Sequence, residues 1–135
     1  MTKARIAILA SGSGSNAEAL MNHFSEAPGA EVGEVAWVCT NRRLAGVRTR
    51  AQAHGIAESH LPKAAIAEGE LLRELSSRHI EWVALAGFLL KVPADVCKAF
   101  EHRMVNIHPA LLPKHGGMGM YGMHVHRAVH EAKES

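Results

Sequence analysis

The stretch Ile6-Ala7-Ile8-Leu9-Ala10-Ser11-Gly12-Ser13-Gly14-Ser15-Asn16 decides the fold that we predict for this chain. Its first five residues are apolar and have the length of a short buried strand. Helical periodicity begins at Asn16 and continues to Phe24. The stretch therefore predicts a buried strand that leads through a short turn into a helix.

The rest of the chain repeats this alternation of strand-like and helical segments. Short connections between such segments indicate a parallel sheet covered by helices on both faces, with right-handed crossovers. We predict an α/β, Rossmann-like fold of about five strands, in a single domain over residues 1–135. The further strands are expected at residues 35–39, 56–61, 82–86 and 103–107. The further helices are expected at residues 43–54 (capped by Gly55), 65–79 and 93–100, with a last one starting near His124.

Composition excludes several classes of protein. The 135 residues are 47% apolar, which suffices for one core, and the formal net charge of +2 indicates no strong attraction to nucleic acid or membrane. The two cysteines, Cys39 and Cys97, lie far apart and show no metal-binding spacing. No segment has the length of a membrane span or of a secretory core. We therefore expect a cytoplasmic protein without nucleic-acid or membrane partners.

The Gly-Ser loop (residues 11–16) has the composition of an anion site. Glycines allow the backbone to approach a ligand closely, and a helix start offers N–H groups and a partial positive charge. Ser13, Ser15 and Asn16 add side-chain donors. We predict that this loop binds a phosphate. A plain strand–helix turn with a serine cap is the structural alternative.

A dinucleotide site is another alternative for the same loop. Gly12-x-Gly14-x-x-Ala17 fits the relaxed dinucleotide fingerprint, which also requires an acidic residue after the second strand. That position reads Thr40-Asn41-Arg42-Arg43. This sequence argues against NAD and leaves an NADP-type arginine pair open.

Asn106 and His108 form the most reactive-looking pair in the chain. Alternate strand residues share one face, so both side chains are expected to point into one cleft where the strand ends. Pro109 and Pro113 force a stiff, non-helical loop directly afterwards. The pair suits polarisation of a carbonyl group and transfer of a proton. A histidine that bonds the backbone and an asparagine in a turn are the structural alternative.

The apolar loop (residues 85–93) leaves the fourth predicted strand and is interrupted by Gly87. Core packing explains some of its side chains. The functional interpretation is a wall for a flat apolar ring.

Together, Asn106-Ile107-His108-Pro109-Ala110-Leu111-Leu112-Pro113, the Gly-Ser loop and Leu85-Ala86-Gly87-Phe88 resemble the glycinamide ribonucleotide transformylases of purine synthesis. The motifs occur in the family's order and spacing. The resemblance implies transfer of a formyl group from 10-formyltetrahydrofolate, as co-substrate, to the amine of glycinamide ribonucleotide. Family members continue several dozen residues further and carry a catalytic aspartate there. We therefore expect a domain that is incomplete at its C-terminal end, binds substrate and turns over poorly.

The resemblance also assigns roles to individual residues. At one of these positions the chain differs from the family, because many members carry an arginine where this chain has Leu90. His124 and His126 are only two potential metal ligands, without a paired carboxylate, so we expect no metal. By resemblance, the catalytic residues are His108 and Asn106. The substrate phosphate-binding residues are Gly12, Ser13, Gly14, Ser15, Asn16 and Ala17. The folate-binding residues are Leu89, Leu90, Lys91, Val92 and Asn106, and Pro109 and Gly117 lie next to the substrate.

Three alternatives remain at this point. The first is formyl transfer to another amine, such as an aminoacyl-tRNA or an amino sugar, and the second is hydrolysis of formyltetrahydrofolate. The third is a non-catalytic module that binds a nucleotide or phosphate. We also expect self-association, because a shortened parallel sheet exposes an edge and apolar surface.

Overall fold

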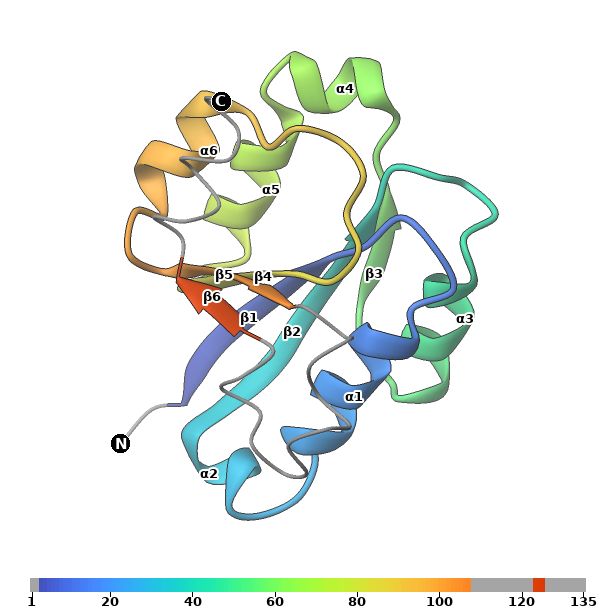
Figure 1. The fold of residues 1–135 in the computed structure, drawn as a ribbon, viewed down its shortest axis with the longest axis vertical. Coiled ribbons are helices and arrows are strands. Elements are labelled where there is room, and N and C mark those ends of the chain that lie inside the picture. The colour runs from blue at the N-terminus through green and yellow to red at the C-terminus, as the bar shows by residue number, and fades with distance from the viewer. Residues whose placement is uncertain (1–2, 108–122, 126–135) are drawn as a thin grey trace.

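The fold is a single sheet with helices on both faces (Figure 1), in a computed structural model that describes residues 3–107 and the backbone of residues 123–125. The strands follow the order β3-β2-β1-β4-β5-β6. Neighbouring strands from β3 to β5 pair in parallel, and β6 pairs with β5 in the antiparallel sense. The predicted α/β, Rossmann-like fold is confirmed. The strands are β1 (Ala4–Leu9), β2 (Gly33–Thr40), β3 (Glu58–His60), β4 (Trp82–Leu85), β5 (Met104–Ile107) and β6 (Met123–Val125).

The helices divide between the two faces of the sheet. Figure 1 shows α1 (Ser15–His23) and α3 (Gly46–Ala53) on one side and α5 (Glu70–Ser77) and α6 (Ala94–Ala99) on the other. α4 (Lys63–Ala67) contributes Ile66 to the same core as α5 and α6. The short helix α2 (Gly29–Val32), which the sequence did not predict, precedes β2.

Each face of β1 packs into a different core. Ala7 and Leu9 belong to the core under α5 and α6, whereas Ile6 and Ile8 belong to the core under α1 and α3. This division follows from the alternation of side chains along a strand. Because both faces of β1 are covered, its buried residues from Ile6 to Leu9 are continuously apolar rather than alternating.

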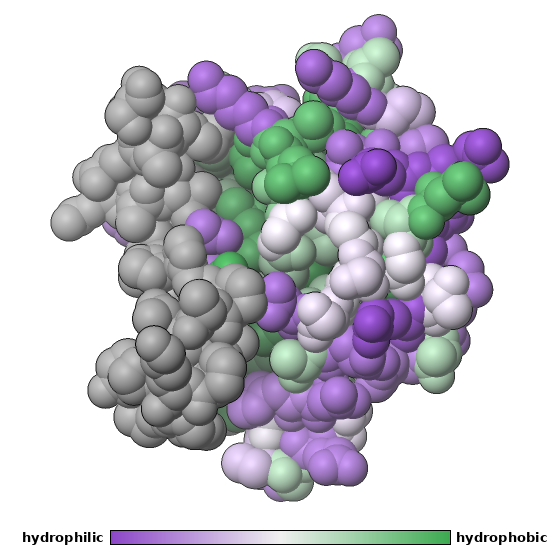
Figure 2. Space-filling view, turned by 45° about the vertical axis from the view of Figure 1, so that its right-hand side comes forward, coloured by the Kyte–Doolittle hydropathy of each residue, from purple (hydrophilic) through white to green (hydrophobic). Residues whose placement is uncertain are grey.

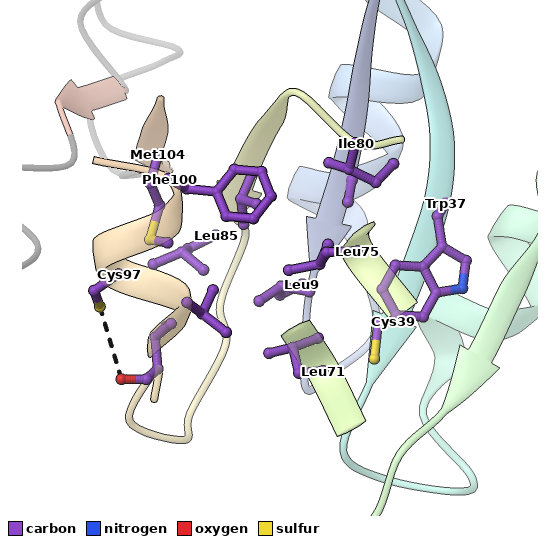
Figure 3. Packing of buried hydrophobic residues seen from close by; sticks show 14 of the residues in the cluster. Leu9, Trp37, Cys39, Leu71, Leu75, Ile80, Leu85, Cys97, Phe100 and Met104 are labelled. Carbon is purple, nitrogen blue, oxygen red and sulfur yellow. Dashed lines mark hydrogen bonds between the residues drawn. The ribbon is translucent and has the colours of Figure 1, made fainter. Parts of the chain in front are cut away.

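The core under α5 and α6 contains the largest buried side chain of the described residues, Trp37. Figure 3 shows Leu9, Leu71 and Leu75 lying between Trp37 and Phe100. The indole Nε1 of Trp37 donates to Ser59 Oγ at 3.1 Å. The polar atom of the ring is therefore satisfied, and apolar groups pack on the ring together with the guanidinium of Arg78, whose Cζ lies 4.7 Å from the ring centroid.

Gly55 ends α3 as predicted from the sequence. It adopts a left-handed conformation with φ +69°, and its N–H donates to Gln52 O at 3.0 Å. The N–H of Ile56 donates to Ala51 O at 2.9 Å. These two bonds form a Schellman motif, which satisfies carbonyl groups at the helix end.

Two helix predictions differ from the structure. The helix expected over 65–79 is divided into α4 and α5, because Gly69 adopts φ +95° and becomes the N-cap of α5. The prediction of a helix starting near His124 is wrong. Residues Met123–Val125 form β6 instead, where His124 is the backbone partner of Asn106.

Within residues 3–107 and 123–125, no helix combines the length and apolar character that a membrane span requires.

Candidate functional site

Loops from β1, β2 and β4 meet at the carboxyl edge of the parallel sheet. The N–H of Ala10 donates to Cys39 O at 3.0 Å, and the N–H of Ser11 donates to Gly87 O at 3.1 Å. The Gly-Ser loop therefore contacts the apolar loop directly. In open α/β sheets, ligands bind at this edge. The structure thus brings two of the three predicted site segments together.

The Gly-Ser loop exposes polar groups next to the start of α1. Gly12, Ser13 and Ser15 are exposed, and Asn16 is half-buried. The N-cap of α1 is Gly14, so no N-cap side chain bonds the first-turn N–H groups, and the serine cap of the structural alternative does not occur there. Ala17 is fully buried, which leaves only its backbone for contact with a ligand.

Helix α3 packs closely against the Gly-Ser loop and fixes its shape. The N–H of Val47 donates to Gly12 O at 3.1 Å. A Cβ on Gly14 would lie 2.6 Å from Cβ of Val47, and a Cβ on Gly46 would lie 3.2 Å from Cα of Ser13. Gly14 is therefore required by the contact between loop and helix, and Gly46 lets the loop approach the helix closely.

Arg50 connects the Gly-Ser loop to both α1 and α3. Its Nε donates to Ser13 O at 2.7 Å, and its guanidinium also binds the carboxylate of Glu18. The other carboxylate oxygen of Glu18 lies 3.2 Å from His54 Nε2. The hydrogen bond with His54, followed by the one with Arg50, lowers the pKa of Glu18.

The apolar loop divides between core and surface. Phe88 and Leu90 pack against the core under α5 and α6, and Val92 is buried in it. Leu89 is 74% exposed, and Lys91 is exposed as well. Core packing therefore accounts for Phe88, Leu90 and Val92, whereas Leu89 lies at the surface. The wall for a flat apolar ring stays a prediction.

Figure 2 shows hydrophobic surface gathered on one face of the molecule, with hydrophilic residues around it. An isolated exposed leucine is ordinary on a protein surface. A leucine at a strand-end edge beside exposed donor groups has the apolar-plus-polar composition of a ligand site.

Asn106 lies on β5 next to the end of β4. Its backbone partner on β4 is Leu85, the last residue of the strand and the first of the apolar loop. By strand alternation Asn106 shares a face with Met104, whose side chain belongs to the core under α5 and α6. His108, Pro109 and Gly117 lie outside the described residues. The shared orientation of Asn106 and His108 thus stays a prediction.

Ser11 and Asn41 are site residues that sequence analysis did not identify. Ser11 is 1% exposed, and its Oγ donates to Asn41 Oδ1 at 2.6 Å. Ser11 Oγ also accepts a hydrogen bond from the N–H of Leu89 at 2.8 Å. A serine directly after a buried strand was the available signal, but no spacing in the sequence identifies its partners.

Within residues 3–107, no group of three His, Cys, Asp or Glu side chains is arranged to hold a metal ion. A pocket of about 270 Å³ lies at the opposite edge of the sheet, where Ala4, Gly33 and Trp82 begin their strands. Apolar side chains line it, so it offers no group for acid–base chemistry.

Comparison with known proteins agrees with the fold. Residues 4–134 match the family described as formyl transferase. The chain is 37% identical over 134 residues to the chloroplastic phosphoribosylglycinamide formyltransferase of Arabidopsis thaliana, covering 95% of this chain and 45% of that protein. It thus spans less than half the length of that relative.

Solved structures give the same result. Glycinamide ribonucleotide transformylase 1 from Geobacillus kaustophilus aligns with a TM-score of 0.72 and 35% identity, over 87% of this chain and 64% of that one. Phosphoribosylglycinamide formyltransferase from Brucella melitensis aligns with a TM-score of 0.74 and 29% identity, over 97% of this chain and 67% of that one. The resemblance inferred from the three sequence motifs is confirmed. The chain belongs to the formyl transferase family.

Proposed function

We propose that this chain forms the substrate-binding part of an enzyme that transfers a formyl group from 10-formyltetrahydrofolate to the amine of glycinamide ribonucleotide. One observation carries the proposal. The Gly-Ser loop, with its exposed donors at the start of α1, is hydrogen-bonded to the apolar loop that exposes Leu89. A phosphate subsite and an apolar-ring subsite thus adjoin at one edge. The names of the relatives support the same reaction.

Each subsite has a separate task in this proposal. The N–H groups at the start of α1, with Ser13, Ser15 and Asn16, bind the ribose phosphate. Leu89 and the backbone of Leu90, Lys91 and Val92 contact the folate ring. These contacts hold the amine near the formyl carbon, and such positioning accounts for much of the acceleration of a two-substrate reaction.

Asn106 and His108 are proposed to act on the formyl group itself. The amine attacks the formyl carbon, and the carbonyl oxygen becomes an oxyanion that requires hydrogen-bond donors. The amide N–H of Asn106 and a ring N–H of His108 are suited to this task. The bond from the formyl carbon to the folate nitrogen then breaks. The attacking amine loses one proton and the departing folate nitrogen takes one up, so no proton is gained or lost overall.

Calorimetry on the 135-residue chain tests the proposal. We expect binding of glycinamide ribonucleotide, with competition by ribose 5-phosphate, and binding of 10-formyltetrahydrofolate. Ser15→Ala should weaken ribonucleotide binding. Ser25→Ala should leave ribonucleotide binding unchanged, because Ser25 lies outside the proposed site. Its hydroxyl donates to the nearby Asn22 O at 2.8 Å. Binding of NADP without affinity for the ribonucleotide would instead favour a nucleotide-binding module.

A formyl-transfer assay separates the remaining alternatives. Weak turnover is expected for this chain, and robust transfer would contradict that expectation. Release of formate without an amine would favour hydrolysis, and transfer to an amino sugar or aminoacyl-tRNA would favour another acceptor. Location in the cytoplasm and self-association also stay predictions, and the Arabidopsis relative is named as chloroplastic.

A further inference from the structure

Ser11 occupies an unusual position for a polar side chain. It follows β1 directly and is 1% exposed. Within the described residues, Thr40 is the other polar side chain buried to this degree, and it lies at the end of the neighbouring strand. A buried hydroxyl is costly unless it is hydrogen-bonded, so its partners define its role.

The partners of Ser11 come from two other loops of the site. Its Oγ donates its single hydrogen to Asn41 Oδ1 at 2.6 Å and accepts the N–H of Leu89 at 2.8 Å. Its own N–H donates to Gly87 O at 3.1 Å. Ser11 is therefore bonded to the loop after β2 and, twice, to the apolar loop after β4.

The Gly-Ser loop, which begins at Ser11, and the apolar loop are held in place by different contacts. The Gly-Ser loop has further contacts with α3, through Val47 N–H and the Nε of Arg50. In the apolar loop, Leu89 itself is 74% exposed, and its N–H is held by Ser11 Oγ. Loss of the hydroxyl should therefore release Leu89 more than the Gly-Ser loop.

We propose that Ser11 is a positioning residue that fixes Leu89 relative to the Gly-Ser loop and thereby sets the distance between the folate and phosphate subsites. The inference rests on the proposed function, because it takes the ligands of both subsites from it. The hydroxyl itself is too buried to contact a ligand. It acts by holding the backbone of the apolar loop, in a reaction where small misplacements have large effects on rate.

The first test compares Ser11→Ala with Ser59→Ala by calorimetry. Both variants remove a serine hydroxyl that accepts a hydrogen bond from an N–H group of another element, the Leu89 N–H in one case and Trp37 Nε1 in the other. Ser11→Ala is expected to weaken binding of 10-formyltetrahydrofolate about tenfold, the effect of one lost hydrogen bond. Ribonucleotide affinity should change less than threefold. Ser59→Ala should leave both affinities unchanged.

The second test follows amide hydrogen exchange at Leu89. Exchange should accelerate in Ser11→Ala and stay unchanged in Ser59→Ala, whatever their global stabilities. This readout requires no ligand. If the unmodified chain binds no folate, the proposed function fails, and the exchange experiment still decides whether Ser11 holds Leu89.

Two outcomes would overturn the inference. One is unchanged folate affinity and unchanged Leu89 exchange in Ser11→Ala. The other is an equal loss of folate affinity in Ser11→Ala and Ser59→Ala, which would reduce Ser11 to a general contribution to stability. If Ser11→Ala does not fold, Ser11→Cys replaces it in both tests. The cysteine thiol has a volume close to that of the serine hydroxymethyl group but forms only weak hydrogen bonds, so folate affinity should again fall.

Discussion

Gly14 and Gly12 lie in the same loop, yet alanine should affect them in opposite ways. Gly14 has φ +86°, and an added Cβ would lie 2.6 Å from Cβ and Cγ2 of Val47 and 2.8 Å from its Cα. Gly12 has no atom within 4 Å of such a Cβ. Gly55 provides the intermediate case, with φ +69° and open space around the added atom. The three positions thus separate backbone strain from steric overlap.

The expected free energies of unfolding follow from these two costs. The left-handed conformation costs an alanine roughly 1–2 kcal/mol, and overpacking adds about 1–3 kcal/mol. Gly14→Ala should therefore destabilise by about 2–5 kcal/mol and Gly55→Ala by about 1–2 kcal/mol. Gly12→Ala should stabilise by roughly 0.4–1 kcal/mol, because alanine restricts the unfolded chain.

Urea denaturation followed by tryptophan fluorescence measures the three variants, since Trp37 is fully buried in the core. Ribonucleotide binding provides an independent measurement. The open space beside Gly12 faces the proposed phosphate, so Gly12→Ala should lose affinity while gaining stability. If Gly14→Ala costs no more than Gly55→Ala, the Gly-Ser loop moves away from α3 freely, and the argument for a fixed loop is refuted.

Three further predictions concern other parts of the molecule. His79→Gly should raise the free energy of unfolding by about 0.5–1 kcal/mol in urea titrations, because His79 is exposed and holds φ +57° at the end of α5. The lowered pKa of Glu18 gives stability that is present above the unfolded-state pKa of about 4.3 and lost as pH falls through the lower folded value. Unfolding measured against pH should therefore show an acid-side loss that Glu18→Gln reduces, while the part that comes from the lowered pKa of Glu58 remains. Burial raises the pKa of the Cys39 thiol to about 12, so iodoacetamide should modify Cys39 only after unfolding, and rapid labelling of the native protein would contradict this.

The parts of the fold that could be predicted are those set by local sequence. A strand buried on both faces is continuously apolar, so β1 was evident from residues 6–10. Gly55 directly follows a helical segment and takes a conformation that other residues adopt at a cost, so the end of α3 was also evident. Alternation of such segments was enough for the parallel sheet.

The parts that could not be predicted depend on contacts between distant residues. The apolar periodicity of Ile66, Leu71 and Leu75 continues across Gly69, and glycine within a helical pattern does not by itself show a break. β6 has three residues and forms by pairing with β5, which propensity at residues 123–125 does not reveal. The partners of Ser11 lie 30 and 78 residues away along the chain.

The contacts of the Gly-Ser loop imply that the proposed anion site is already shaped before a ligand binds. Gly14 packs on Val47, and Arg50 binds the Ser13 carbonyl, so the loop is held by α3. A ligand then has little backbone to order, and affinity rises when this entropic cost is absent. Leu89 has fewer such supports and depends on Ser11. It follows that the ribonucleotide subsite should be the more rigid of the two, and that substitutions which loosen the site should reduce folate affinity first.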